Sequence, residues 1–226
     1  MKPVYIILTS ISLVYLCSCD NGKAQKRQQE AAEKARIDSL ETIRLDSLSQ
    51  FAWGDVKFGI SVNEAKTNNI FNNENPICEK NSPFCFITLY NTSDKINIRG
   101  VFSLKASFFN NRLYEIKLES YSAYNTNDKE LVNTSRVLHY LIKEKFGDPT
   151  RDTSVNLSLF ESRNRESMPL YYWEIGHKHI SINIEKVFQN QVHITCLIIH
   201  NIENVPVEAY NKKLKEETES KRVNSF

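Results

Sequence analysis

Glycine-rich nucleotide-binding loops and the common catalytic motifs are missing from this sequence. It has six glycines among 226 residues, and none forms Gly-x-Gly-x-x-Gly, which excludes the common dinucleotide-binding fingerprint. Gly-x-Ser-x-Gly and His-Glu-x-x-His are also absent. The stretch 54–61 has the glycine spacing of a phosphate-binding loop, but Ile60 stands where a lysine must reach the phosphates. We therefore expect no cofactor and no metal site, and favour a protein without catalytic activity.

An excess of one charge is also lacking. The sequence has 29 Lys and Arg against 27 Asp and Glu, a formal net charge of +2, and it has no basic stripe. Binding to nucleic acid needs Lys and Arg gathered on one face to displace the counterions of the phosphates. The charge balance therefore predicts no nucleic-acid partner.

The N-terminus carries a short, largely apolar run over residues 4–16, behind a lysine at position 2. A charged start followed by a short apolar core is typical of an export signal, and the core is too short to span roughly 30 Å of hydrocarbon as a helix. The run closes with Leu16-Cys17-Ser18-Cys19, which resembles the lipobox of bacterial lipoproteins of the Bacteroidota type. In that resemblance Cys19 is the acylated residue.

The lipobox implies a signal peptide over residues 1–18 and a mature protein that begins at Cys19 with several acyl chains. Two or more chains anchor a protein stably in a bilayer, whereas one binds marginally. We thus expect a lipid-anchored protein of the cell envelope, at the outer membrane, with the side it faces left open. Two alternatives stay open. Cys17 departs from the usual lipobox pattern, so cleavage before Cys17 is one of them, and a plain secreted protein is the other.

Residues 19–50 are rich in Gln, Glu, Ala, Lys and Arg and predict a charged tether, either an exposed helix or a loose chain. Within it the segment 36–40 recurs as 44–48, and the interval of eight residues does not fit the heptad of a coiled coil. Both copies contain Asp-Ser-Leu, at 38–40 and 46–48. This triplet resembles an O-glycosylation acceptor of Bacteroidota, and an unmodified, solvated helix face is the alternative.

Cysteine usage fits an exported protein. Cys78 and Cys85 flank a polar loop and can close a disulfide in an oxidising compartment, worth about 2 to 3 kcal/mol. A redox or metal role is the alternative, but the spacing is not Cys-x-x-Cys. Cys196 lies in an apolar run and is predicted to be a buried free thiol.

Residues 51–202 predict an α+β globular domain. Ser61 and Glu64 form a capping box that starts a helix reaching to about residue 71. A strand over 85–90 follows, and then a hairpin over 101–121. Matching the apolar faces of its two arms favours a three-residue loop, 109–111, with Asn111 in the left-handed conformation, over a two-residue turn.

A second helix is predicted from Asn127 to Gly147-Asp148-Pro149, where a glycine and a proline stop it. Strands are predicted over residues 155–161, 171–175, 179–186 and 191–200. The apolar residues of the last two strands match only if the loop between them has an odd number of residues. The polar tail 203–226 is expected to be partly helical, with Val207, Tyr210 and Leu214 at helical spacing.

Phe109-Asn110-Asn111 and Phe188-Gln189-Asn190 occupy comparable places after the two helices. This echo suggests two copies of one plan, a helix followed by an antiparallel meander. The predicted fold is therefore an antiparallel sheet with two packed helices, arranged as a tandem repeat and preceded by the tether.

The segments 58–65 and 146–149 resemble the opening Gly-Met-Thr/Ser-x-x-Glu-Val and the closing Gly-x-Pro of small envelope domains of the SmpA/OmlA and beta-lactamase-inhibitor-like type. The first helix departs from that pattern, because residues 72–76 replace its Gly-Pro stop. The resemblance implies a helix-plus-sheet module that binds other proteins.

Candidate site residues lie near the C-terminal strands. His177 and His179 can project from one strand face, with Glu185 further along, unless Gly176-His177 forms a turn. The alternative is that this strand face is simply exposed to solvent, because the side chains on the other face of the strand are isoleucines. Because side chains alternate along a strand, the rings of Tyr171-Tyr172-Trp173 must lie on both faces of the sheet. Such rings could bind a partner, bind a glycan or pack in the core. We name His179, Tyr171 and Trp173 as ligand or partner candidates.

These observations favour a membrane-anchored envelope lipoprotein that binds a protein or a cell-envelope component without catalysis. The alternative is an enzyme or a small-ligand carrier with a pocket between sheet and helices. A binding module predicts an exposed sheet face or groove, whereas an enzyme predicts ionisable groups that converge in a deep pocket.

Overall fold

Two units make up the chain in a computed structural model, Met1–Leu45 and Asp46–Phe226. The structure describes residues 4–72, 74–90, 102–120, 128–153, 167–186 and 192–223. The first unit is described as helix α1 (Val4–Ser49), whose last turn belongs to the second unit. All the strands and the other helices lie in the second unit.

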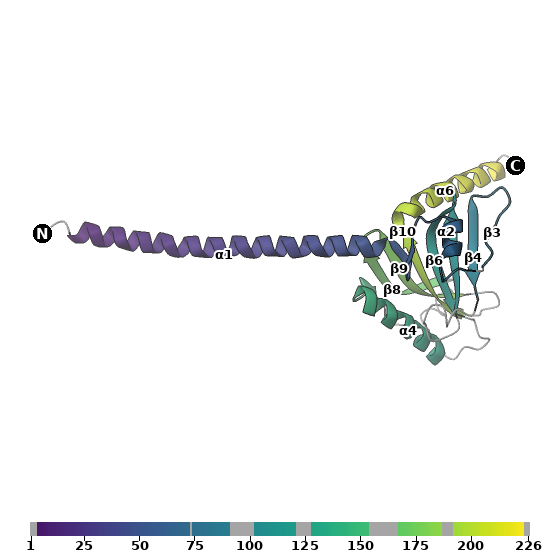
Figure 1. The fold of residues 1–226 in the computed structure, drawn as a ribbon, viewed down its shortest axis with the longest axis horizontal. Helices are drawn as coiled ribbons and strands as arrows, with labels where there is room; N and C mark the ends of the chain where they lie inside the picture. Colours follow the sequence, from purple (N-terminus) through teal and green to yellow (C-terminus); the bar gives the residue numbers. More distant parts are fainter. Residues whose placement is uncertain are drawn as a thin grey trace. The chain divides into compact units, whose positions relative to one another are not determined.

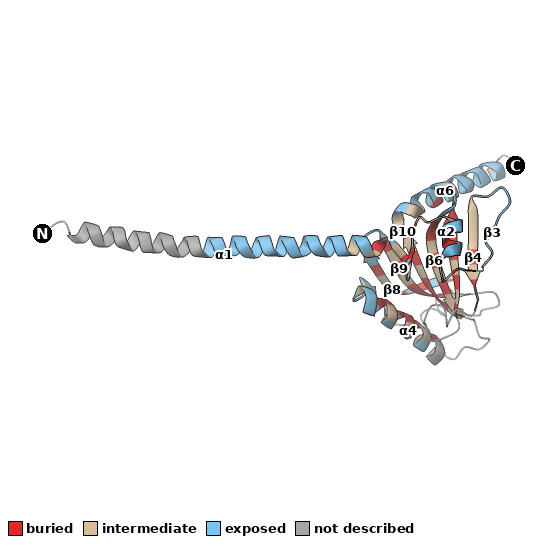
Figure 2. Ribbon diagram, in the orientation of Figure 1, coloured by how far each residue is buried: buried red, intermediate tan, exposed pale blue. Residues whose placement is uncertain are grey.

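Helix α1 contains nearly all of residues 19–50, the segment predicted as a tether, together with most of the segment predicted as a signal peptide. From Lys23 to Arg44 every side chain is exposed (Figure 2). Ion pairs between side chains three or four positions apart support the helix, including Arg44 Nη2 and Glu41 Oε1 at 2.7 Å. The serines of the repeated triplets, Ser39 and Ser47, are both exposed. Within the described ranges, no helix combines the length and apolarity needed to cross a membrane.

Among the described residues of the second unit, eight strands form one antiparallel sheet (Figure 1). In spatial order they are β3 (Ile77–Cys78), β4 (Phe84–Leu89), β5 (Phe102–Phe109), β6 (Arg112–Ser120), β10 (Val192–His200), β9 (Lys178–Lys186), β8 (Ser167–Ile175) and β7 (Arg151–Asp152). The remaining elements are β1 (Phe51–Trp53), β2 (Val56–Lys57), α2 (Val62–Thr67), α4 (Asp128–Phe146) and α6 (Asn201–Val223). Strands β1 and β2 pair only with each other, and the fold is α+β as predicted.

The strand order confirms the tandem plan. Helix α2 precedes the meander β3-β4-β5-β6, and α4 precedes the meander β7-β8-β9-β10. The last strands of the two meanders, β6 and β10, pair in the middle of the sheet, so the two halves are arranged symmetrically about that pair. The apolar side chains of the central strands are almost fully buried.

Helices α4 and α6 lie on opposite faces of the sheet (Figure 1). His139 of α4 stacks on Tyr171 and lies close to Trp173, on the face that also holds Ile180 and Ile182. Val207 of α6 packs instead against Phe109, which points to the other face because successive side chains of β5 alternate. Helix α4 therefore covers the apolar face, and α6 covers one end of the polar one.

The hairpin β5-β6 corrects the predicted turn. Phe109 pairs with Arg112, so the turn has two residues, and both Asn110 (φ 47°) and Asn111 (φ 63°) have the positive φ of a type I′ turn. The three-residue loop was wrong because the faces are matched by a β-bulge instead: Ser107 pairs with Glu115 and Phe108 with Leu113. The extra residue, Tyr114, turns to the opposite face.

Local signals locate the helices well. The capping box is present, with Glu64 N donating to Ser61 Oγ at 3.2 Å and Ser61 N donating to Glu64 Oε2 at 2.7 Å. Helix α2 ends at Thr67, earlier than predicted, because the side chain of Asn68 accepts a hydrogen bond from Ile70 N in a turn of its own. Gly147 (φ +84°) ends α4 as predicted.

The cysteine predictions are confirmed. Cys78 and Cys85 form a disulfide between β3 and β4, and Cys196 is a buried free thiol whose pKa burial raises to about 12. The predicted match of β9 and β10 also holds, since Lys186 pairs with Val192 across a loop of odd length. The predicted strand 155–161, the helix start at Asn127 and the loop 188–190 lie outside the described residues.

The turn generates a testable prediction. We expect Asn111→Ala to lower the free energy of unfolding by about 1 to 2 kcal/mol, because alanine is strained at positive φ. Asn111→Gly is the matched control, since it removes the same hydrogen bond from Val62 N to Asn111 Oδ1 but tolerates the backbone conformation. Urea denaturation measures both, and equal losses would contradict the strain.

Candidate binding site on the polar face of the sheet

The central strands carry a charged network on the sheet face opposite α4. We call it the polar face and define it by Lys105, Glu115, Lys117, Glu119, Glu185, His193 and Thr195. Strand alternation places these residues there: their neighbours Leu118, Ile184, Ile194 and Cys196 all point into the core. The register then brings strands far apart in sequence together, with Glu119 opposite Thr195 and Glu185 opposite His193.

Lys117 is the centre of this network. Its Nζ lies 2.8 Å from Glu119 Oε1 and 3.1 Å from Glu185 Oε2, and its side chain is 24% exposed. Burial disfavours the charged amine, but the hydrogen bonds and charges of the two carboxylates raise the pKa of Lys117 overall. Lys117 therefore stays protonated and joins strand β6 of the first repeat to strand β9 of the second.

Glu185 receives three side-chain donors. His193 Nε2 lies 3.5 Å from Oε2, and Thr195 Oγ1 donates to Oε1 at 3.0 Å. The hydrogen bond from His193, together with those from Lys117 and Thr195, lowers the pKa of Glu185 to about 2 against the opposing effect of burial. This carboxylate is thus a fixed negative charge in a half-buried position.

The neighbouring carboxyl, Glu115, has a different environment. Burial raises its pKa, although Ser107 Oγ donates to Glu115 Oε1 at 3.0 Å. Burial and the nearby Glu115 raise the pKa of Tyr114 to about 12. Lys105 completes this side of the polar face, with its Nζ 4.0 Å from the ring centroid of Phe86.

Aromatic rings flank the polar face at both edges of the sheet. Phe86 lies on β4, where Phe84 stacks beside it at 6.4 Å. Tyr172 lies on β8 opposite Ser181, and the guanidinium carbon of Arg151 is 5.8 Å from its ring centroid. All three rings are partly exposed. The polar face is therefore a charged centre between two aromatic margins.

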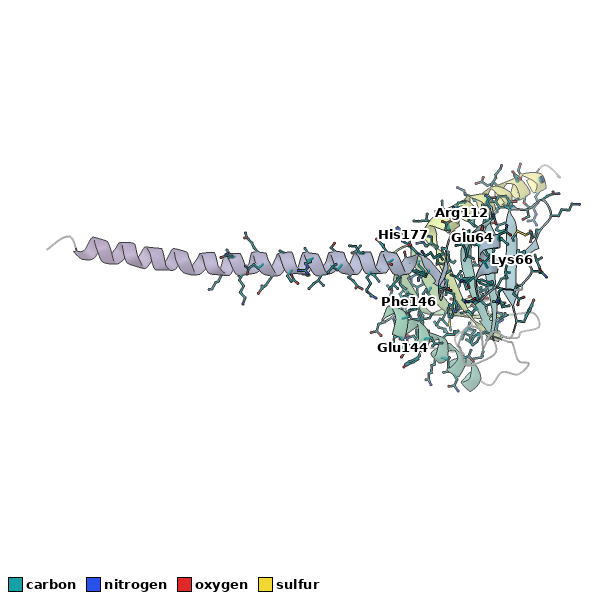
Figure 3. The ribbon with its side chains drawn as sticks, in the orientation of Figure 1. Glu64, Lys66, Arg112, Glu144, Phe146 and His177 are labelled. Atoms are coloured by element: carbon teal, nitrogen blue, oxygen red, sulfur yellow. A yellow bond between two sulfur atoms is a disulfide. The ribbon has the colours of Figure 1, made fainter. Side chains whose placement is uncertain are left out.

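Helix α6 bounds the polar face at one end. Val207 and Tyr210 pack against Phe84, Phe109 and Tyr114. Arg112, labelled in Figure 3, holds the start of this helix, with Nε donating to Glu203 Oε2 at 2.8 Å and Nη2 to Oε1 at 2.6 Å. These hydrogen bonds lower the pKa of Glu203. The tail predicted to be partly helical is thus a packed element in its first turns.

The residues predicted from the sequence lie in different places. His179 is on the polar-face side of β9, with its Nε2 2.9 Å from Asn201 Nδ2 and its ring 5.5 Å from that of Tyr172. Tyr171 and Trp173 face α4, and Trp173 Nε1 donates to the carbonyl of Gly147 at 3.0 Å. Tyr172, not named as a candidate, is the ring on the polar face.

The turn alternative was the right one for His177. Gly176 and His177 connect β8 to β9, so His177 is exposed and does not share a strand face with His179. The structure therefore does not bring His177, His179 and Glu185 together. In the part of the chain that the structure describes, no three His, Cys, Asp or Glu side chains are grouped to hold a metal ion.

Sequence reasoning missed most of the polar face. Glu115, Lys117 and Glu119 alternate in β6, and that period of two could have identified a charged strand face. The sequence placed Glu185 on the face of His179, but it did not predict that Glu185 meets Lys117, because that contact needs the pairing of β9 with β10 and of β10 with β6. Comparison of this chain with family models, with curated proteins and with solved structures found no match.

The depressed pKa of Glu185 predicts a pH dependence. A carboxyl whose pKa is lowered in the folded state stabilises that state at pH values above the ordinary carboxyl pKa of 4.5. This stabilisation is lost as the pH falls towards 2. We expect Glu185→Gln to make the unfolding free energy, measured by urea denaturation, decrease less over this pH window. Glu217→Gln on the exposed surface of α6 is the control, and identical profiles for both variants would contradict the role of Glu185.

Proposed function

We propose that this chain is a lipid-anchored protein of the bacterial cell envelope that binds a protein or another envelope component, without catalysis, through its polar face. The lipobox-like Leu16-Cys17-Ser18-Cys19 supports the anchor, placed at the outer membrane. The residues after Cys19 form a helix up to Ser49, a length of about 45 Å at 1.5 Å per residue. The anchor and the polar face thus belong to different parts of one chain.

The paired charges of the polar face give the strongest support. A general acid or base works best with a pKa near the operating pH. The pKa values of Lys117 and Glu185 are shifted away from that range: Glu119 and then Glu185 raise the pKa of the amine, and His193 and then Lys117 lower the pKa of the Glu185 carboxyl. Charges held in this way serve to orient and select a partner.

The aromatic margins add to this support. Aromatic residues are enriched in protein interfaces, where a ring supplies a large contact area at a low cost in conformational entropy. Phe86 and Tyr172 are partly exposed on either side of the charged centre. A partner that covers both rings would also cover Lys117 and Glu185, which lie between them in the strand order.

The anchor is tested by two cysteine variants of the full chain. We expect Cys19→Ser to move the protein out of the membrane fraction and to remove the added mass of acyl chains from the intact protein. Cys17→Ser is the matched control and should leave both unchanged. Release by Cys17→Ser alone would place the acylation at Cys17, and no release by either would refute the lipid anchor.

The polar face is tested with a photoreactive benzophenone amino acid in intact cells. Placed at Ser181, on the polar-face side of β9, it should give a discrete adduct on illumination. At Tyr140, which is 60% exposed on α4, it should not. We expect Lys105→Glu to reduce the adduct at least about fivefold, from the loss of roughly 1 kcal/mol or more of charge complementarity. Lys66→Glu on α2 should leave it unchanged.

Equal adducts from Ser181 and Tyr140 would refute recognition by the polar face. The same conclusion would follow if Lys66→Glu and Lys105→Glu reduced the adduct equally, since Lys66 is exposed on a helix outside this face.

A further inference from the structure

A second feature lies on the opposite side of the sheet, where α4 meets the strand β1. A pocket of about 210 Å³ opens between these elements and β10. Its walls are mainly apolar, and the residues that matter here are Trp53, Leu141, Ile142, Phe146 and Ile198, with Lys145 as the charged member. Figure 3 labels Phe146 at the C-terminal end of α4. Ile198 points to the apolar face, so this pocket is separate from the polar face.

Two lysines near this pocket have no carboxylate partner among the described residues, and Lys145 is the one that lines it. Lys145 lines the pocket and is exposed, with its Nζ 5.4 Å from the ring centroid of Phe146. Lys178 is buried behind Phe146, with Nζ 4.2 Å from the ring centroid, and donates to the carbonyls of Leu48 at 2.7 Å and Phe51 at 3.0 Å. Its exposed fraction is 1%. Its hydrogen bonds to two backbone carbonyls satisfy the buried amine without a carboxylate.

Burial also changes the pKa values of the basic groups near the pocket. Burial, with a contribution from the charge of Lys145, lowers the pKa of Lys178 to about 7. The neighbouring His200, which is also buried, has a lowered pKa because of burial, with smaller effects from His177 and Lys178, while Glu203 opposes the shift. Glu203 itself is bound to Arg112. Both shifts favour the neutral amine and imidazole, so the charge available to a ligand is that of Lys145, the charged residue among the described residues that line the pocket.

The size of the pocket limits the ligand. An apolar cavity of roughly 150 Å³ holds one benzene molecule, so about 210 Å³ accommodates roughly eight heavy atoms. Apolar walls with one exposed cation fit a molecule with a short aliphatic or aromatic body and one negative end. We propose that this pocket binds a small monocarboxylate of that kind, with its apolar body against Trp53 and Phe146 and its carboxylate paired with Lys145.

The proposal is independent of partner binding by the polar face and can be tested on the full chain in phosphatidylcholine nanodiscs. The probe is 6-bromohexanoate, whose bromine quenches a tryptophan fluorophore in contact with it. We expect saturable quenching of Trp53, about tenfold stronger in apparent affinity than with the neutral 6-bromohexan-1-ol, since a hydrogen bond to a charged group contributes about 1.5 kcal/mol or more. Empty nanodiscs correct for partition into lipid.

Three variants test the location of the site. Lys145→Gln should weaken 6-bromohexanoate binding about tenfold and leave the alcohol unaffected. Lys143→Gln, which removes an equal charge from a lysine paired with Asp148 on the same helix, should leave both unaffected. Trp53→Phe should abolish the saturable quenching, because the other tryptophan, Trp173, is buried. Equal quenching by acid and alcohol, or equal effects of the two lysine variants, would overturn the proposal.

Discussion

The two meanders become one sheet through the antiparallel pairing of β6 with β10, which runs from Glu119 opposite Thr195 to Glu115 opposite Ile199. This pairing sets both faces at once. On one side it aligns Leu118 with Cys196 in the core, and on the other it places Lys117 within reach of Glu185 on the next strand. A slip of one residue would exchange the two faces. The core and the polar face therefore depend on the same register.

Neither repeat contains the polar face by itself. Lys117 and Glu119 come from the first meander, whereas Glu185, His193 and Thr195 come from the second. The pocket is likewise composite, since it combines Trp53, which precedes the first repeat, with Phe146 of α4 and Ile198 of β10. The duplicated plan builds a sheet with one apolar and one polar side. The junction of its halves creates the polar face, whereas the pocket forms where β1 meets α4 and β10 of the second half.

Lys178 links the pocket to the N-terminal part of the domain. Its amine bridges the carbonyls of Leu48, in the last turn of α1, and Phe51, in β1. A cation near the C-terminal carbonyls of a helix interacts favourably with the helix dipole, which offsets part of the cost of burying it. The same side chain lies over Phe146 at the end of α4. One buried amine of β9 thus joins the end of α1 and the adjacent β1 to α4, which is distant from them in sequence.

Local sequence signals determined the parts of the fold whose physics is local. The capping box at Ser61 and Glu64, the stop at Gly147, the disulfide and the parity of β9 with β10 depend on neighbouring residues or on strict alternation. The turn at Asn110 and Asn111 was predicted wrongly because alternation alone does not foresee a bulge. Tyr114 leaves the β6 alternation to pack with Phe109 and Val207, and Val207 lies on a helix far along the chain.

The sequence by itself therefore determined the fold class, the repeated plan, most strand faces and the cysteine pairing. Only the tertiary structure decided which charges meet, because the contact between Lys117 and Glu185 needs two successive strand pairings, and that Lys145 lines an apolar pocket. The physical reason is that side-chain alternation is a property of one strand. The neighbours of a charge are a property of the whole sheet.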